Sequence, residues 1–154
     1  MIAEQQNAPD FSTPDQNNEI VNLADFNGKK NVVLYFYPKD DTPGCTIEAN
    51  QFTQYIDEYS SHDTVVYGVS KDSCASHVDF INKFDLKVGL LADTDGKCCE
   101  DYGVWQEKEK NGVKKMGIVR SSFIIDKKGI IRFAEYNVVP DGHAQAVLEK
   151  IKQL

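Results

Sequence analysis

The feature that most constrains this fold is an apolar run joined by a short polar turn to a helical pattern. The run Val32-Val33-Leu34-Tyr35-Phe36-Tyr37 has no polar face, which is typical of a strand buried on both sides of a parallel sheet. The octet Pro38-Lys39-Asp40-Asp41-Thr42-Pro43-Gly44-Cys45 follows, and helical periodicity comes next. This order predicts a strand–turn–helix unit of an α/β protein.

The octet places Cys45 in the first turn of that helix. Pro43 suits the first helical position, because its fixed φ matches a helix and its missing N–H is not needed there. Thr42 then falls at the N-cap, where its oxygen can accept from the free amides of the first turn. The sulfur of Cys45 therefore faces unpaired N–H groups and the positive end of the helix dipole.

These surroundings favour the thiolate, which is the nucleophilic form of cysteine. A free cysteine is more often a small buried hydrophobic residue. The neighbours of Cys45 are Pro, Gly, Thr and Asp, which are not typical of a core position. We therefore predict that Cys45 is a reactive cysteine.

Length and charge indicate a single globular domain spanning residues 1–154. The formal net charge of −7 argues against non-specific binding to nucleic acid or to an anionic membrane. No run approaches the length of a membrane-spanning helix, and residues 1–6 lack the basic region and apolar core of a signal peptide. We expect a cytoplasmic protein whose four cysteines are reduced at rest.

The cysteines and histidines do not predict a metal site. The four cysteines form no C-x-x-C pair, and the three histidines lie far apart in the sequence. The chain also has no Gly-rich phosphate loop of the Walker or dinucleotide type. The sequence therefore predicts neither a metal nor an organic cofactor.

The rest of the chain alternates between β and α patterns. The expected elements are a hairpin within 1–30, a strand at 32–37, a helix at about 43–60, a strand at 64–70, a helix capped by Asp72 or Ser73, a strand at 88–92, a helix at about 97–102, a charged loop or hairpin tip at 106–115, strands at 120–125 and 130–136, and a helix capped by Asp141. The three longer helices are expected to bury Phe52, Ile56 and Tyr59, then Val78, Ile81 and Phe84, and finally Val147, Leu148, Ile151 and Leu154. This order predicts a mostly parallel sheet with helices on both faces, ending in an antiparallel hairpin and a helix.

Cysteines follow three of the predicted strands. Cys45 comes after the first parallel strand, Cys74 after the second, and Cys98 and Cys99 after the third. Since the carboxyl ends of parallel strands meet at one edge of the sheet, where chemistry gathers, we expect the thiols near one edge.

The segment Pro38-Lys39-Asp40-Asp41-Thr42-Pro43-Gly44-Cys45-Thr46 resembles the peroxidatic segment of peroxiredoxins, in particular the PrxQ or bacterioferritin comigratory protein subfamily. Similar strings extend along nearly the whole chain: Gly68-Val69-Ser70-Lys71-Asp72-Ser73, Leu91-Ala92-Asp93, Tyr102-Gly103-Val104 and Arg120-Ser121-Ser122-Phe123-Ile124-Ile125-Asp126. The resemblance implies a thioredoxin-like fold and a thiol peroxidase that reduces hydrogen peroxide and organic hydroperoxides. It further implies thioredoxin or a similar dithiol as reductant, no cofactor, and often a monomer.

The resemblance also assigns roles to residues of this chain. Cys45 would be the peroxidatic nucleophile, and Thr42 would hold the thiolate and the peroxide in line. Pro38 would shield the sulfur, and Arg120 would donate to both thiolate and peroxide. Glu48, one turn after Cys45, is either a carboxylate that orients Arg120 through a paired hydrogen bond or an ordinary solvated one.

The resolving cysteine is the point at which the chain departs from the subfamily. Asn50 and Ile81 occupy the two positions at which similar proteins carry that second thiol. Cys74 lies about two helical turns before Ile81, on nearly the same face, and is the first candidate. Cys99 is the second candidate, and Cys98 comes behind it.

A disulfide to Cys45 would require local unwinding, because its two Cα atoms must come within roughly 7 Å of each other. The alternative is a one-cysteine enzyme reduced by an external thiol, in which the other three cysteines are packing residues.

Two other functions are open to a chain with this sequence. A thiol–disulfide oxidoreductase is disfavoured, because Cys45-Thr46-Ile47-Glu48 lacks the second thiol of a C-x-x-C pair. A non-enzymatic redox sensor or chaperone-like protein would use oxidation of Cys45 to change a surface. Rapid peroxide turnover with a thiol donor separates the enzyme from the sensor.

Overall fold

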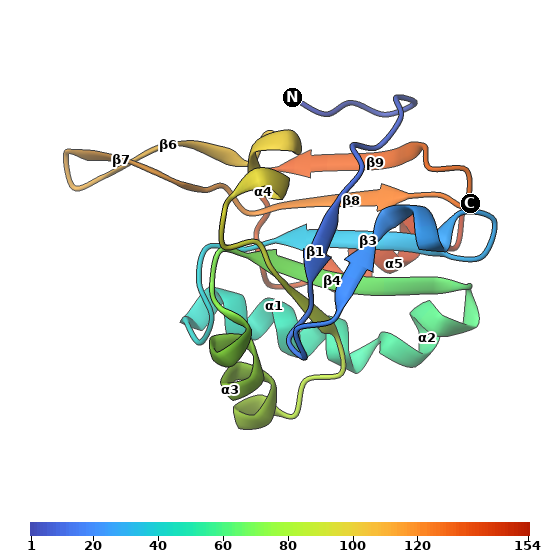
Figure 1. The fold of residues 1–154 in the computed structure, drawn as a ribbon, viewed down its shortest axis with the longest axis horizontal. Coiled ribbons are helices and arrows are strands. Elements are labelled where there is room, and N and C mark those ends of the chain that lie inside the picture. Colours follow the sequence, from blue (N-terminus) through green and yellow to red (C-terminus); the bar gives the residue numbers. More distant parts are fainter.

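A computed structural model describes all 154 residues and centres on one five-stranded sheet (Figure 1). Its strands, in spatial order, are β5 (Gly89–Ala92), β4 (Thr64–Ser70), β3 (Asn31–Phe36), β8 (Ser121–Ile125) and β9 (Ile131–Tyr136). β5, β4 and β3 run parallel, whereas β8 and β9 pair antiparallel. The prediction of a mixed sheet with a C-terminal hairpin is confirmed.

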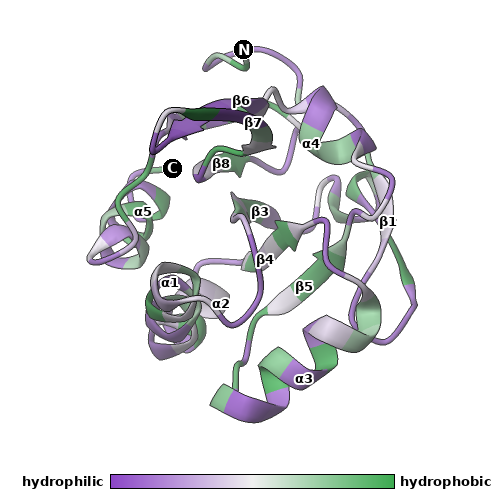
Figure 2. Cartoon of the chain, turned by 90° about the vertical axis from the view of Figure 1, so that its left-hand side faces the viewer, coloured by the Kyte–Doolittle hydropathy of each residue, from purple (hydrophilic) through white to green (hydrophobic).

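Helices cover both faces of the sheet, as predicted. The helices α1 (Pro43–Gln54), α2 (Ile56–Ser61), α3 (Cys74–Phe84) and α5 (His143–Ile151) contribute to one buried cluster. The short helix α4 (Lys97–Asp101) and the 3-10 helix η1 (Leu23–Phe26) contribute to a second cluster across the sheet. Figure 2 shows the strands between α1, α2 and α5 on one side and α4 on the other.

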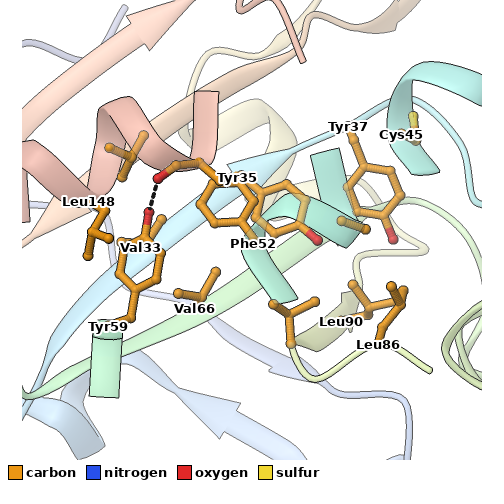
Figure 3. Packing of buried hydrophobic residues seen from close by; sticks show 14 of the residues in the cluster. Val33, Tyr35, Tyr37, Cys45, Phe52, Tyr59, Val66, Leu86, Leu90 and Leu148 are labelled. Carbon is orange, nitrogen blue, oxygen red and sulfur yellow. Dashed lines mark hydrogen bonds between the residues drawn. The ribbon is translucent and has the colours of Figure 1, made fainter. Parts of the chain in front are cut away.

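The central strand β3 supplies both clusters because its side chains alternate between the two faces. Val33, Tyr35 and Tyr37 point into the α1 cluster, and Tyr35 stacks on Phe52 of α1 with ring centroids 4.5 Å apart. Figure 3 shows Cys45 at one end of this cluster, beside Tyr37. Packing against β3 therefore sets where the first turn of α1 lies.

The predicted helix over 43–60 is two helices. α1 ends at Gln54, and α2 begins at Ile56, with Tyr55 at φ −100° and ψ 8° between them. Thr53, Tyr55 and Ile56 are β-branched or aromatic residues of lower helix propensity, and their succession is consistent with a break here. The break lets Tyr59 turn inward, where its hydroxyl donates to the Ala144 carbonyl at 2.6 Å.

Two expectations on the last helix are wrong. Gly142, with φ +81°, precedes α5, and the Asp141 carboxylate instead accepts a hydrogen bond from Gln51 at 2.7 Å. Leu154 lies beyond the end of α5 and is exposed. A left-handed residue before the helix suits glycine, because it has no Cβ to clash.

The expected cap of α3 is confirmed, and its buried face is partly as predicted. Ser73 accepts a hydrogen bond from the Ser76 N–H. Ile81 and Phe84 pack half-buried against the core as expected, but the fully buried residues are His77 and Phe80. A pattern based on apolar residues alone could not place a histidine inside.

The expected hairpins form. β1 (Ser12–Pro14) and β2 (Ile20–Asn22) pair near the N-terminus. The charged segment forms β6 (Trp105–Lys110) and β7 (Val113–Ile118), which project from the body of the molecule (Figure 1). Asn111 and Gly112 connect them with φ of +53° and +78°, as tight hairpin turns require. None of the helices combines the length and the apolar character that a bilayer crossing needs.

Candidate active site

Cys45 lies where the central strand passes into α1. Thr42 is at the N-cap in an extended conformation, Pro43 is the first helical residue, and Cys45 is 1% exposed. These positions match the prediction, but the Thr42 side chain does not cap the helix. Its hydroxyl donates instead to the Lys39 carbonyl at 2.8 Å. Because the hydroxyl proton of Thr42 is already in this hydrogen bond, the Thr42 oxygen can only accept a hydrogen bond from any further group.

Arg120 reaches Cys45 from the neighbouring strand. It directly precedes β8, and the register that pairs Phe36 with Ser121 places it next to the end of β3. Its Nη2 lies 3.3 Å from the Sγ of Cys45, and its Nη1 lies 2.7 Å from the Oε1 of Glu48. Glu48 is fully buried, so the alternative of a solvated carboxylate is wrong.

Burial and charge act in opposite directions on this pair. Burial would lower the pKa of Arg120, but the charges of Glu48 and Cys45 outweigh it and raise that pKa overall. Burial raises the pKa of Glu48 to about 7, although Arg120 pulls it down. The Oε2 of Glu48 has no hydrogen-bond partner. Arg120 therefore stays charged while Glu48 titrates close to neutral pH.

Gly44 is a site residue that the sequence did not single out. A Cβ at this position would lie 3.1 Å from the Nη2 of Arg120 and 3.4 Å from the Cγ of Pro140. Glycine here lets the guanidinium pass close to the first turn of α1. The only signal in the sequence is the position of Gly44 directly before Cys45.

The structure does not bring every predicted residue to the sulfur. Pro38 is exposed, just after the central strand, and its shielding role stays a prediction. Cys74 is the first residue of α3, and its thiol donates to the Asp15 carbonyl at 3.2 Å, toward the turn between β1 and β2.

Cys98 and Cys99 lie in the cluster on the other face of the sheet from Cys45. Burial raises the pKa of both thiols, and their backbone N–H groups donate to the Asp93 carboxylate. Asp93 directly follows β5, so this pair lies at the carboxyl edge of the strands as expected, but on the other face from Cys45. Helix α4 crosses to the opposite face, and the sheet separates it from α1. All four cysteines are free.

The sequence model of the AhpC/TSA family matches residues 5–134, most of the chain. The chain belongs to the AhpC/TSA family. Peroxiredoxin Bcp of Bacillus subtilis is 40% identical over 149 residues, which cover 97% of this chain and 94% of the relative. Peroxiredoxin Bcp of Escherichia coli is 41% identical over 146 residues, or 95% of this chain and 93% of the relative.

Solved peroxiredoxin structures share the fold. PrxQ of Xylella fastidiosa superposes with a TM-score of 0.93 at 31% identity, covering 99% of this chain and 97% of that one. Peroxiredoxin Q of Xanthomonas campestris gives a TM-score of 0.88 at 34% identity, covering 93% and 90%. The resemblance to PrxQ and the thioredoxin-like fold are confirmed, and this peroxiredoxin is a thiol peroxidase.

Glu48→Gln is expected to change how the stability of this peroxiredoxin depends on pH. The folded protein holds the Glu48 proton up to about pH 7, whereas an unfolded chain releases it near 4.5. The contribution of the Glu48 carboxyl to the free energy of unfolding is therefore fully present below pH 4.5 and is lost as the pH rises through 7. At about 1.4 kcal/mol per pH unit, the loss is on the order of 3 kcal/mol.

Urea unfolding at pH 4.5 and pH 8 measures this effect. Between pH 4.5 and pH 8, the unfolding free energy of the native protein should fall by that amount relative to the unfolding free energy of Glu48→Gln. The exposed Glu149→Gln serves as the control and should show no such shift. A difference for Glu48→Gln that does not change with pH would contradict the prediction.

Proposed function

We propose that this peroxiredoxin reduces hydroperoxides through Cys45, with Arg120 and Thr42 positioning the substrate. The contact that carries the proposal is the 3.3 Å approach of Arg120 Nη2 to the Cys45 sulfur. A guanidinium keeps its proton at neutral pH, so it stabilises the thiolate without protonating it. The N-terminal position in α1 adds the positive end of a helix dipole.

The reaction is a displacement at oxygen. The Cys45 thiolate attacks the terminal oxygen of the hydroperoxide, the S–O bond forms, and the O–O bond breaks. Sulfur becomes a sulfenic acid, and the departing oxygen takes a proton to leave as water or an alcohol. Arg120 is placed to donate to oxygens on which negative charge develops, which lowers the barrier.

Thr42 defines the orientation of the peroxide. Because its hydroxyl donates a hydrogen bond to the Lys39 carbonyl, its oxygen is available to accept a hydrogen bond from the peroxide O–H. Arg120 supplies donors to the peroxide oxygens. One acceptor and one donor group, held by different elements, would bind the O–O bond in one direction.

Glu48 is proposed as the residue that orients Arg120. Its Oε1 lies 2.7 Å from Nη1, which leaves Nη2 directed at the sulfur. For Pro38 we keep the role of limiting solvent access as a proposal from family resemblance alone.

The substrate class is proposed to include organic hydroperoxides as well as hydrogen peroxide. A Xanthomonas campestris bacterioferritin comigratory protein, 33% identical, is described as having alkyl peroxide reduction activity. In this chain an open groove of about 450 Å³ borders Arg120, and Val119 and Val138 are the two hydrophobic residues among the seven that line it. An alkyl group leaving the O–O bond could occupy this space.

Among the other thiols, we propose Cys74 as the internal resolving candidate. It is partly exposed at the start of α3, whereas Cys98 and Cys99 lie across the sheet from Cys45. Its sulfur points toward Asp15, so the first turns of both α1 and α3 would have to open. Without such opening, an external dithiol such as thioredoxin would attack the sulfenic acid directly.

In either case a dithiol of the thioredoxin type is proposed to regenerate the Cys45 thiol, and the chain is proposed to act as a monomer. The cytoplasmic location stays a prediction. A reducing compartment would keep Cys45 and the other three thiols available.

The test is intact mass and peptide mapping after one equivalent of hydrogen peroxide is added to the reduced protein. Loss of two hydrogens mapped to Cys45 and Cys74 would establish an internal disulfide, and Cys74→Ser should then give one added oxygen on Cys45. A gain of one oxygen on Cys45 in the native chain would instead mean reduction by an outside thiol. An unmodified Cys45 would refute the proposed function.

A further inference from the structure

A buried polar network lies beside the active-site loop and has no part in the chemistry described so far. His77 of α3 is 0% exposed, Asp40 of the loop 7%, and Tyr37 1%. The Nδ1 of His77 lies 2.7 Å from Asp40 Oδ2, and its Nε2 lies 2.9 Å from the Leu91 carbonyl. Both ring nitrogens of His77 thus have hydrogen-bond partners. A buried charged side chain costs free energy unless an opposite charge pairs with it.

The hydrogen-bond partners define the protonation of His77. A carbonyl oxygen can only accept, so Nε2 carries a proton toward Leu91. The Asp40 carboxylate already accepts from the Tyr37 hydroxyl at 2.6 Å and from the Ser76 hydroxyl at 2.8 Å. Burial would raise the pKa of Asp40, but its hydrogen bonds from His77 and Tyr37 lower it overall. Asp40 is thus ionised, and Nδ1 of His77 must also donate, which makes the pair a buried His⁺–Asp⁻ ion pair.

This ion pair attaches the active-site loop to the body of the protein. Asp40 lies five positions before Cys45, and its backbone N–H donates to the Asp72 carboxylate at 2.8 Å. The loop is therefore tied to α3 by a side chain and to the end of β4 by its backbone. Lys39, the residue just before Asp40, provides the carbonyl that accepts the hydrogen bond from the Thr42 hydroxyl.

We propose that His77 is a positioning residue for peroxide reduction, which holds the loop through Asp40 so that Lys39 orients the Thr42 hydroxyl. The inference rests on the proposed function, because Thr42 matters only if a peroxide binds beside Cys45. His77 itself touches neither the sulfur nor the substrate. Its effect is on how accurately the acceptor oxygen of Thr42 is placed.

The test compares two reactions of Cys45 in the full chain, each followed under single-turnover conditions. Oxidation by hydrogen peroxide depends on the placement of Thr42, whereas alkylation by iodoacetamide depends only on the thiolate and its access. His77→Gln keeps the size of the side chain but loses the charge and one of the two hydrogen bonds. We expect the oxidation rate constant to fall about 10- to 100-fold, as a displacement of about 1 Å would cause. Alkylation should change by less than about threefold.

Controls separate positioning from general damage. The exposed His62→Gln should leave both reactions unchanged, and Ser76→Ala, which removes one of the hydrogen bonds to Asp40, should give a smaller fall in oxidation alone. Asp40→Asn removes the negative charge of the same His77–Asp40 pair. It substitutes for His77→Gln if that variant does not fold. The ¹⁵N shifts of His77 in the native protein should show both ring nitrogens protonated, as their two acceptors require.

Three results would overturn the inference: an unchanged oxidation rate, an equal change in both reactions, or a His77 ring with one unprotonated nitrogen. Failure of the proposed function has a different signature, because the native protein itself would then not react with peroxide.

Discussion

Replacing Cys45 with Ser is expected to lower peroxide turnover by at least about 10³-fold, the largest effect of any single change in this chain. A serine hydroxyl is not ionised at neutral pH, so no comparable nucleophile would remain beside Arg120. The measurement is hydrogen peroxide consumption with dithiothreitol as the reductant. This small dithiol avoids any dependence on a protein partner.

The matched control is Cys98→Ser, which changes a buried thiol on the other face of the sheet. It should retain turnover within a few-fold of the native protein. The prediction fails if Cys45→Ser keeps more than about one hundredth of the native rate, or if Cys98→Ser loses as much as Cys45→Ser does.

Replacing Arg120 with Met is expected to lower the rate constant for Cys45 oxidation by about 10²- to 10³-fold. The change removes the donor 3.3 Å from the sulfur, and loss of one such donor typically costs this much. Stopped-flow measurement of the reduced protein with hydrogen peroxide gives the rate constant. Arg132→Met is the control, because Arg132 is the only other arginine and pairs with Asp126 away from the site.

The same substitution separates catalysis from stability. Arg120→Met leaves the Glu48 carboxylate buried without its partner, a change that typically costs about 3–5 kcal/mol. Protonation of Glu48 offsets part of this cost, since its pKa is already near neutral. Adding Glu48→Gln should therefore restore stability to urea without restoring the oxidation rate. Recovery of the rate in the double variant would show that Arg120 acts only through folding.

Local patterns predicted the strand–turn–helix unit well because its signals are local. Thr42, Pro43 and Cys45 occupy the N-cap, first and third helical positions that capping rules assign to them. The strand at 64–70 and the C-terminal hairpin follow from β-branched runs and a tight turn in the same way. Each of these depends on residues within a few positions of one another.

The contacts between distant elements could not be predicted in this way. Nothing in the sequence near Asp141 shows that its carboxylate accepts from Gln51, 90 positions away. Nothing near Tyr59 shows that its hydroxyl donates to Ala144 of α5, 85 positions away. In both cases a partner distant in the sequence supplies a hydrogen bond that local rules do not anticipate.

The sequence by itself therefore determined the kind of fold and singled out Cys45 as the proposed reactive cysteine. The order of the elements specifies the sheet, and the capping residues specify the helix turn that holds Cys45. The family resemblance already implied Arg120 beside that thiol. Only the tertiary structure decided the rest of its surroundings: the burial of Glu48 against Arg120, the position of Cys98 and Cys99 across the sheet, and the burial of His77 against Asp40. The physical reason is that helix and strand patterns arise from neighbouring residues, whereas burial and ion pairing arise from residues 37 to 75 positions apart.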